Sequence, residues 1–144
     1  MIQEDTIKLL RECDEGVKMG VASIDAVLDY VSSQTLKTFL SESKNEHEKL
    51  GEKIKQLLDS YHDDGKEPNP MAKGMSWLKS NVKLKFNESD SVAADIITDG
   101  ADMGIKSLNK YLNEYTHADE NSKEIAKELI RIEEQLNRDI RRFL

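Results

Sequence analysis

The chain has 144 residues, of which 34% are charged and 38% are hydrophobic, and its formal net charge at pH 7 is −7. This balance is typical of a globular protein rich in helix formers, and the length suits one domain with a single substantial core. The negative charge argues against nucleic acid and anionic membrane surfaces as partners, because both attract lysine and arginine.

Targeting and redox signals are absent from the sequence. No apolar run approaches the roughly 20 residues that a transmembrane helix needs. The acidic stretch from Met1 to Thr6 lacks the apolar segment of a secretory signal. Cys13 is the only cysteine, so the chain can form no intrachain disulfide. We therefore expect a cytoplasmic protein with neither a membrane nor a nucleic acid as its partner.

Two long helices are predicted in the first part of the chain. Across residues 7–31, apolar side chains recur at steps of three and four, the spacing of one helical face, with a polar interruption at Asp14. Residues 32–35 break this pattern, and a second stripe, interrupted at His47, covers residues 36–61. Two long helices with so short a connection must be antiparallel neighbours.

The next segment changes character. Residues 62–89 begin with a turn-like stretch that holds both prolines. Residues 71–86 then fit a short amphipathic helix that contains Trp77 and presents lysines outward. A connector of this length can cross a helix of about 25 residues, which is about 38 Å long.

Two further helices complete the prediction. The third is expected over residues 90–115, and a capping box at Asn121–Glu124 opens the fourth, which continues to the C-terminus. The sequence therefore predicts an all-α fold, an up-down-down-up four-helix bundle. It forms a single domain over residues 1–144, in which a crossover at 62–89 joins hairpin 1–61 to hairpin 90–144.

The two predicted hairpins resemble each other in sequence. The segment Glu15–Ile24 recurs as Asp99–Leu108, 84 positions further along the chain. The segment His47–Leu50 lines up with Glu133–Leu136 at an offset of 86. A repeat this long that is present only twice indicates a duplicated helical hairpin, with the two copies related by a pseudo-twofold axis.

The repeat carries two pairs of glycines, Gly16 with Gly20 and Gly100 with Gly104. A glycine inside a helix costs ~1 kcal/mol relative to alanine, so four of them need a reason. We predict that they allow close packing of the first helix against the third. The alternative is that they leave room for a ligand or an ion beside these helices.

A second set of residues predicts a polar layer inside the bundle. Asp14 and His47 interrupt the two apolar stripes, and the repeat offsets make Thr98 and Glu133 their counterparts. Polar groups inside a bundle cost a few kcal/mol unless they are paired. The layer of Asp14, His47, Thr98 and Glu133 is therefore a hydrogen-bonded network, a metal site or a site that water can reach.

These features together resemble the ferritin-like superfamily. The chain is most similar to an uncharacterised bacterial ferritin-like family that has an Asp-Gly-x-x-x-Gly type of segment, here Asp14 to Gly20, and a tryptophan in the crossover helix, here Trp77. Di-iron members of the superfamily place a glutamate on the first and third helices and a Glu-x-x-His motif on the second and fourth.

The ligand set implied by this resemblance is incomplete. Lys44 stands three positions before His47 where a glutamate belongs, and Asn137 follows Glu134 where a histidine belongs. The resemblance thus implies a degenerate di-iron site. Four carboxylates on symmetric positions, with His47 in reserve, could still hold iron or manganese. These candidate metal ligands are Glu15, Glu48, Asp99, Glu134 and His47.

The expected function follows from this incomplete site. We expect a non-enzymatic ferritin-like helical bundle with a structural or interaction role, for example in stress response or in a protein coat. We predict no catalytic residue and no cofactor, and a homodimer is one option for its assembly. The first alternative is a metal-binding oxidase or storage protein that uses iron or manganese. The second is a module that binds a small molecule or a partner helix in the glycine-lined groove.

Overall fold

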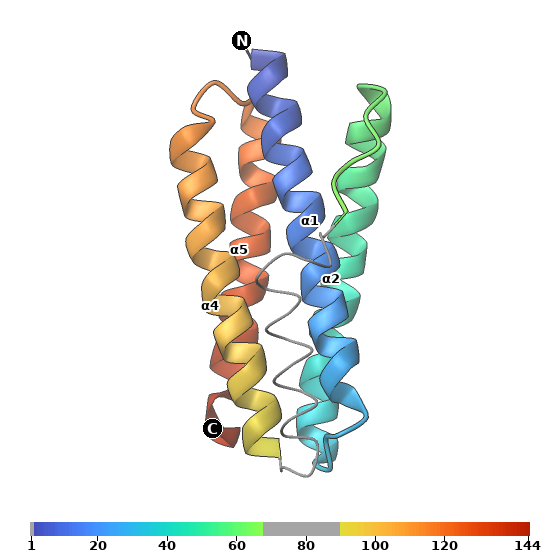
Figure 1. Ribbon diagram of the computed structural model, residues 1–144, viewed down its shortest axis with the longest axis vertical. Helices are drawn as coiled ribbons and strands as arrows, with labels where there is room; N and C mark the ends of the chain where they lie inside the picture. Colours follow the sequence, from blue (N-terminus) through green and yellow to red (C-terminus); the bar gives the residue numbers. More distant parts are fainter. Residues whose placement is uncertain (1, 68–89) are drawn as a thin grey trace.

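The computed structural model describes residues 2–67 and 90–144 (Figure 1). The amphipathic helix predicted over residues 71–86, with Trp77, lies outside the described residues. Within the described ranges the chain is helical and contains no strand, which confirms the predicted all-α four-helix arrangement. The elements are α1 (Ile2–Leu28), α2 (Gln34–Ser60), α4 (Asp90–Glu114), α5 (Glu120–Ile140) and a final 3-10 turn, η1 (Arg141–Phe143).

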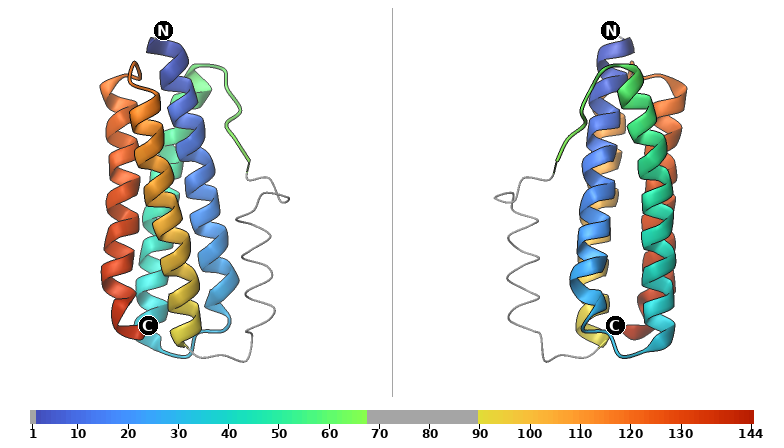
Figure 2. Two further views of the ribbon diagram at one scale, coloured as in Figure 1. Left: turned by 60° about the vertical axis from the view of Figure 1, so that its left-hand side comes forward. Right: turned by 90° about the vertical axis from the view of Figure 1, so that its right-hand side faces the viewer.

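The four helices lie side by side along one long axis (Figures 1 and 2). α1 runs from the end that bears the N-terminus to the opposite end, and α2 returns beside it. α4 begins at the end where α2 begins, and α5 runs back antiparallel to it. α1 packs against α2 within its own hairpin and contacts both helices of the other hairpin. In the same way, α5 packs against α4 and contacts both α1 and α2.

Polar side chains fix where the helices begin. The Ser33 hydroxyl accepts a hydrogen bond of 3.3 Å from the backbone amide of Leu36 and starts α2. The Asp119 carboxylate accepts one of 2.8 Å from the amide of Ser122 and starts α5. The predicted capping box that begins at Asn121 is therefore wrong by two residues, because Asp119 supplies the capping oxygen first.

Asp90 ties the start of α4 to the connection between α1 and α2. Its two carboxylate oxygens accept hydrogen bonds from the backbone amides of Ser32, at 2.7 Å, and Ser33, at 3.0 Å. Because the carboxylate is charged, these hydrogen bonds are stronger than those between neutral groups. The contact holds the two hairpins in a fixed relation at this end of the bundle.

The core consists of two apolar clusters stacked along the bundle. The first apolar cluster is built around Leu9, Leu10, Leu50, Ile54 and Leu129. The second apolar cluster is built around Ile24, Leu36, Leu40, Ile97 and Ile140. Near the middle of each helix a short stretch separates the residues of the two clusters. These stretches hold Gly20, Gly100, Gly104, His47 and Glu133.

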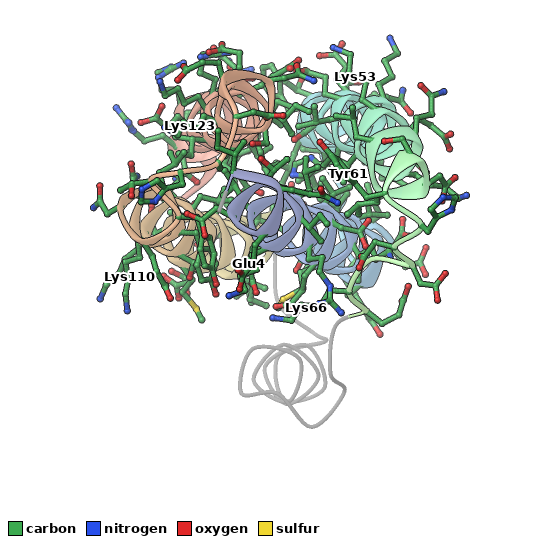
Figure 3. All side chains as sticks on the ribbon, turned by 90° about the horizontal axis from the view of Figure 1, so that it is seen from above. Glu4, Lys53, Tyr61, Lys66, Lys110 and Lys123 are labelled. Carbon is green, nitrogen blue, oxygen red and sulfur yellow. The ribbon has the colours of Figure 1, made fainter. Side chains whose placement is uncertain are left out.

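The outside of the bundle is strongly polar. Seen along the long axis, charged side chains such as Lys53 and Lys110 point away from the centre (Figure 3). None of the helices in the described ranges combines the length and the apolar character that crossing a bilayer requires.

Candidate functional site

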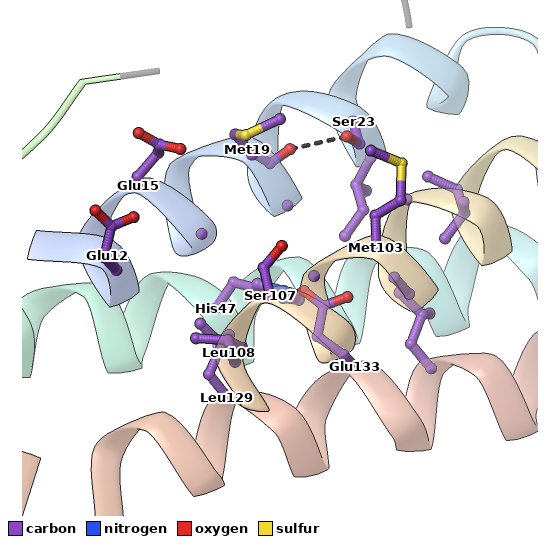
Figure 4. Close-up of a pocket in the computed structure, with 18 of the residues that line it drawn as sticks. Glu12, Glu15, Met19, Ser23, His47, Met103, Ser107, Leu108, Leu129 and Glu133 are labelled. Carbon is purple, nitrogen blue, oxygen red and sulfur yellow. Dashed lines mark hydrogen bonds and ion pairs between the residues drawn. The ribbon is translucent and has the colours of Figure 1, made fainter. Parts of the chain in front are cut away.

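A cavity of about 160 Å³ occupies the gap between the two apolar clusters (Figure 4). We call it the interhelical cavity. Residues of α1 and α4 form most of its wall, and α2 and α5 close it on the inner side with His47, Leu129, Glu133 and Leu136. The wall on α1 and α4 includes all of the repeated glycines, Gly16, Gly20, Gly100 and Gly104.

The glycines of α4 border open space rather than packed atoms. A Cβ atom placed on Gly100 would meet nothing within 4 Å. One placed on Gly104 would approach only Glu133, a residue of α5, with the nearest atom at 3.8 Å. The close packing of α1 against α4 that the sequence predicted for these two positions is therefore wrong, because the missing side chains leave room that no neighbour fills.

The glycines of α1 have a different role. A Cβ atom on Gly16 would lie 3.3 Å from the Leu129 side chain, and one on Gly20 would lie 2.7 Å from the His47 ring. These two glycines do permit close packing, but against side chains of α5 and α2 and not against α4. The duplicated glycine pairs thus serve two purposes that the repeat alone could not distinguish.

His47 and Glu133 form a buried pair on the inner side of the cavity. His47 is 0% exposed and Glu133 is 7% exposed. The His47 Nε2 atom lies 2.9 Å from Glu133 Oε1, and Nδ1 lies 2.7 Å from the backbone oxygen of Ser43. Because the Ser43 carbonyl oxygen can only accept a hydrogen bond, the His47 Nδ1 atom carries a proton. The Nε2 atom shares a proton with the Glu133 carboxylate.

The charge state of this histidine follows from its surroundings. Burial disfavours the imidazolium and acts to lower the pKa of His47. The hydrogen bond and the negative charge of Glu133, with a smaller contribution from the Ser43 carbonyl, outweigh burial and leave the pKa raised above its ordinary value. Glu133 thus favours the imidazolium form of His47, and the pair is held between the two apolar clusters.

Only one oxygen of Glu133 is used by this pair. Oε1 faces His47, whereas no described residue donates a hydrogen bond to Oε2. Figure 4 shows one oxygen of the carboxylate turned away from His47. A Cβ atom on Gly104 would lie 3.9 Å from Oε2, so this oxygen faces the part of the cavity that the α4 glycines leave open.

The outer side of the cavity is bordered by partly exposed residues. Met19 is half-buried, Met103 is 50% exposed, and Ser107 is exposed. Figure 4 shows the two methionines on facing stretches of α1 and α4. Since methionine side chains are flexible and apolar, they can move aside without losing specific polar contacts.

One end of the cavity carries a small charged group of side chains. The Lys66 Nζ atom lies 2.8 Å from Glu12 Oε1 and 3.3 Å from Glu15 Oε2. Burial raises the pKa of Tyr111, which lines the same end, and the nearby Glu12 carboxylate adds to the effect. The Glu15 predicted as a metal ligand is thus paired with a lysine from the segment that follows α2.

Asp14 and Thr98 do not join the His47–Glu133 pair. Asp14 is 7% exposed, and its Oδ2 atom accepts from Lys18 Nζ at 2.8 Å and from the backbone amide of Lys66 at 2.9 Å. It therefore anchors the segment after α2 to α1. The Thr98 hydroxyl oxygen is buried without a hydrogen-bond partner among the described residues. The predicted four-residue polar layer is reduced to a pair.

The candidate metal ligands are not gathered in one place. Glu48, Asp99 and Glu134 are exposed on three different helices, and Glu15 is half-buried beside Lys66. His47 is engaged with Glu133 and Ser43. Within residues 2–67 and 90–144, no group of three or more histidine, cysteine, aspartate or glutamate side chains is arranged to hold a metal ion. The donor set therefore does not fit the ferritin-type centre.

Cys13 also has no part in chemistry at this site. The thiol is buried in the first apolar cluster. Burial, with the nearby charges of Glu12 and Asp14, raises the pKa of Cys13 to about 12. A thiol in this state is not a nucleophile at neutral pH.

Comparison of the chain with models of protein families, with curated proteins and with solved structures finds no match.

Proposed function

We propose that this chain is a non-enzymatic four-helix bundle that binds a small, largely apolar molecule between α1 and α4. The observation that carries the proposal is the interhelical cavity of about 160 Å³, bordered by four glycines and located between two packed apolar clusters. An apolar cavity of about 150 Å³ holds a molecule the size of benzene. The available volume thus suits a ligand of one small ring.

The α4 glycines support this role. A helical glycine costs ~1 kcal/mol relative to alanine, and that cost is usually balanced by close packing. Gly100 and Gly104 have no close neighbour that requires them. Their free-energy cost is understandable if the space they leave is filled by a ligand.

The hydrogen bonding of His47 and Ser23 gives no support to catalysis by a histidine base with a serine nucleophile in this cavity. A general base needs a free lone pair within reach of the substrate. Both ring nitrogens of His47 are engaged, and the Ser23 hydroxyl donates to the Met19 carbonyl at 2.8 Å. The donor geometry gives no support to the metal-binding alternative in the described part of the chain.

We also propose that the bundle is a duplicated hairpin of the ferritin-like kind. The order of the helices and the long segment between α2 and α4 support this origin. So does the pairing of His47 with Glu133, because these two residues are equivalent at the repeat offset of 86. Equivalent residues meet when they lie beside a twofold axis.

The binding proposal is tested by nuclear magnetic resonance titration with toluene. We expect the backbone amide signals of the cavity glycines to shift, whereas Gly51, a helical glycine that does not line the cavity, serves as the internal control. Gly100→Leu should abolish the response by filling the space, and Gly100→Ala should retain it. Lys106→Leu adds the same side chain at an exposed position of α4 and should also retain it.

Two results would contradict the proposal. The first is that toluene at saturating concentration leaves the signals of Gly16, Gly20, Gly100 and Gly104 unchanged. The second is that Gly100→Leu responds to toluene as the unmodified chain does, since the probe would then bind elsewhere.

A further inference from the structure

We propose that the ligand of the interhelical cavity is a small organic ammonium ion whose charged nitrogen donates a hydrogen bond to Glu133 Oε2. Its apolar body would have about six to eight non-hydrogen atoms, the size that a cavity of about 160 Å³ accepts. The inference rests on the binding role proposed above and adds the chemical class of the ligand.

The first step of the argument is the incomplete hydrogen bonding of Glu133. This residue is 7% exposed, and its Oε1 atom is bonded to His47. Oε2 faces the cavity and has no donor among the described residues. Oε2 is not one of the described side-chain atoms that are buried without a hydrogen-bond partner, so solvent in the cavity reaches it. A ligand that displaces this solvent must supply an N–H or O–H group to Oε2, because otherwise the carboxylate oxygen loses its hydrogen bonding.

The second step is the charge at the cavity. Three carboxylates, those of Glu12, Glu15 and Glu133, line the cavity, and the cations that they contact are at most two, Lys66 and a protonated His47. At least one negative charge remains, and it favours a cationic ligand over a neutral or anionic one. The formal net charge of −7 on the whole chain also favours the approach of cations.

The third step distinguishes an ammonium ion from a metal ion. Calcium and magnesium need about six oxygen ligands. The Glu12 and Glu15 carboxylates in the cavity wall are engaged by Lys66, and within the described residues no group of three or more acidic, histidine or cysteine side chains is arranged to hold a metal ion. Much of the remaining cavity wall consists of glycines and apolar side chains such as Leu129, Leu136 and Ile97. Such walls suit the hydrocarbon part of an amine and would leave a metal ion without ligands.

The test uses four probes that share one ring: benzylamine, benzyl alcohol, toluene and benzoate. At pH 7 we expect benzylamine to bind about 10- to 100-fold more tightly than toluene, because a charge-assisted hydrogen bond is added. Benzyl alcohol should lie between them, and benzoate should not bind detectably. Titration calorimetry with the full chain measures the four affinities.

A variant locates the effect at one side chain. Glu133→Gln keeps the size of the residue and removes its charge, so the ratio of the benzylamine affinity to the toluene affinity should fall about 10- to 100-fold. Glu134→Gln is the matched control, since Glu134 is exposed and adjacent on α5, and it should change neither affinity. If Glu133→Gln does not fold, the ranking of the four probes on the unmodified chain decides the question.

The outcomes separate this inference from the proposed function. Equal affinities for toluene and benzylamine would leave a binding cavity in place and overturn the ammonium assignment. Benzoate binding as tightly as benzylamine would overturn it as well. If no probe binds, the cavity is not a ligand site, and the proposed function fails together with the inference.

Discussion

Both ring nitrogens of His47 face oxygen atoms in a place that water does not reach. The carbonyl of Ser43 holds one proton on Nδ1, and Glu133 shares the proton on Nε2. Burying an ion pair gives little net stability, because desolvation offsets most of the attraction. What the pair does is fix the mutual position of α2 and α5 at mid-bundle and present one carboxylate oxygen to the cavity.

The raised pKa of His47 predicts how stability depends on pH. The contribution of His47 to the free energy of unfolding is complete below the unfolded-state pKa of about 6.5. It is lost as the pH rises through the higher pKa of the folded state. The charged groups that act on His47 are Glu133 from α5 and Glu46 from its own helix, whereas α1 presents only Gly20.

We therefore expect denaturant unfolding of the protein to require less denaturant as the pH increases above about 6.5. His47→Gln should lack this part of the pH dependence, while His117→Gln controls for the loss of an exposed imidazole. Identical pH profiles for the original chain and His47→Gln would show that the buried pair does not titrate in this way.

At the scale of the elements, the two glycine-bearing helices behave differently. α1 needs its glycines because side chains from α2 and α5 occupy the space where a Cβ atom would be. α4 does not, because its glycines border the cavity. This contrast makes a glycine of the first pair and a glycine of the second pair respond oppositely to the same substitution.

Gly20→Ala should destabilise the bundle, because its Cβ atom would be 2.7 Å from the His47 ring and the buried pair would have to shift. Gly100→Ala should stabilise it by up to ~1 kcal/mol, since alanine favours the helix and meets no neighbour. Denaturant titration of both variants measures the two changes. Changes of the same sign would contradict the packing described here.

The start of α5 allows a sharp test of its capping residue. Asp119→Ala removes the acceptor of the Ser122 amide and should cost ~1 kcal/mol of unfolding free energy. Asn121→Ala, at the exposed position where the sequence pattern predicted the cap, should change stability by less than ~0.5 kcal/mol. Thermal unfolding distinguishes the two, and the reverse order would restore the capping box at Asn121.

At the scale of the whole molecule, the two apolar clusters share the same four helices but few neighbours. Leu9 belongs to the first cluster and Leu40 to the second, and each is 0% exposed. The polar pair and the cavity separate them. The bundle should nevertheless unfold as one unit, because every helix takes part in both clusters.

Leu9→Ala and Leu40→Ala should each cost ~2–5 kcal/mol of unfolding free energy. The double variant should lose the sum of the two, because residues without shared partners act independently. Urea unfolding followed by circular dichroism checks both points in a single series. Two separate transitions in either single variant would show that the clusters unfold independently.

Periodicity was sufficient to predict the helices. Apolar side chains must cover one face of each helix, so the stripes and their breaks located four helices in the described ranges. Most of the predicted helix ends lie within a few residues of the observed ones. His47 was recognisable as an interior polar residue because it interrupts that face, and Glu133 was recognisable as its counterpart at the repeat offset of 86. Glu48 and Glu134 directly follow them, and a step of one residue turns a helix by about 100°, which directs these carboxylates outward.

The sequence by itself determined the helical class, the short connections and the polar interruption at mid-bundle, because these depend on neighbours along one helix. Only the tertiary structure decided which of the equivalent glycines pack and which leave a cavity, because that depends on side chains arriving from other helices. The same holds for Lys66, which reaches Glu12 and Glu15 from a segment without any periodic signal. Distances between helices are set by how whole faces fit together, and no local pattern encodes them.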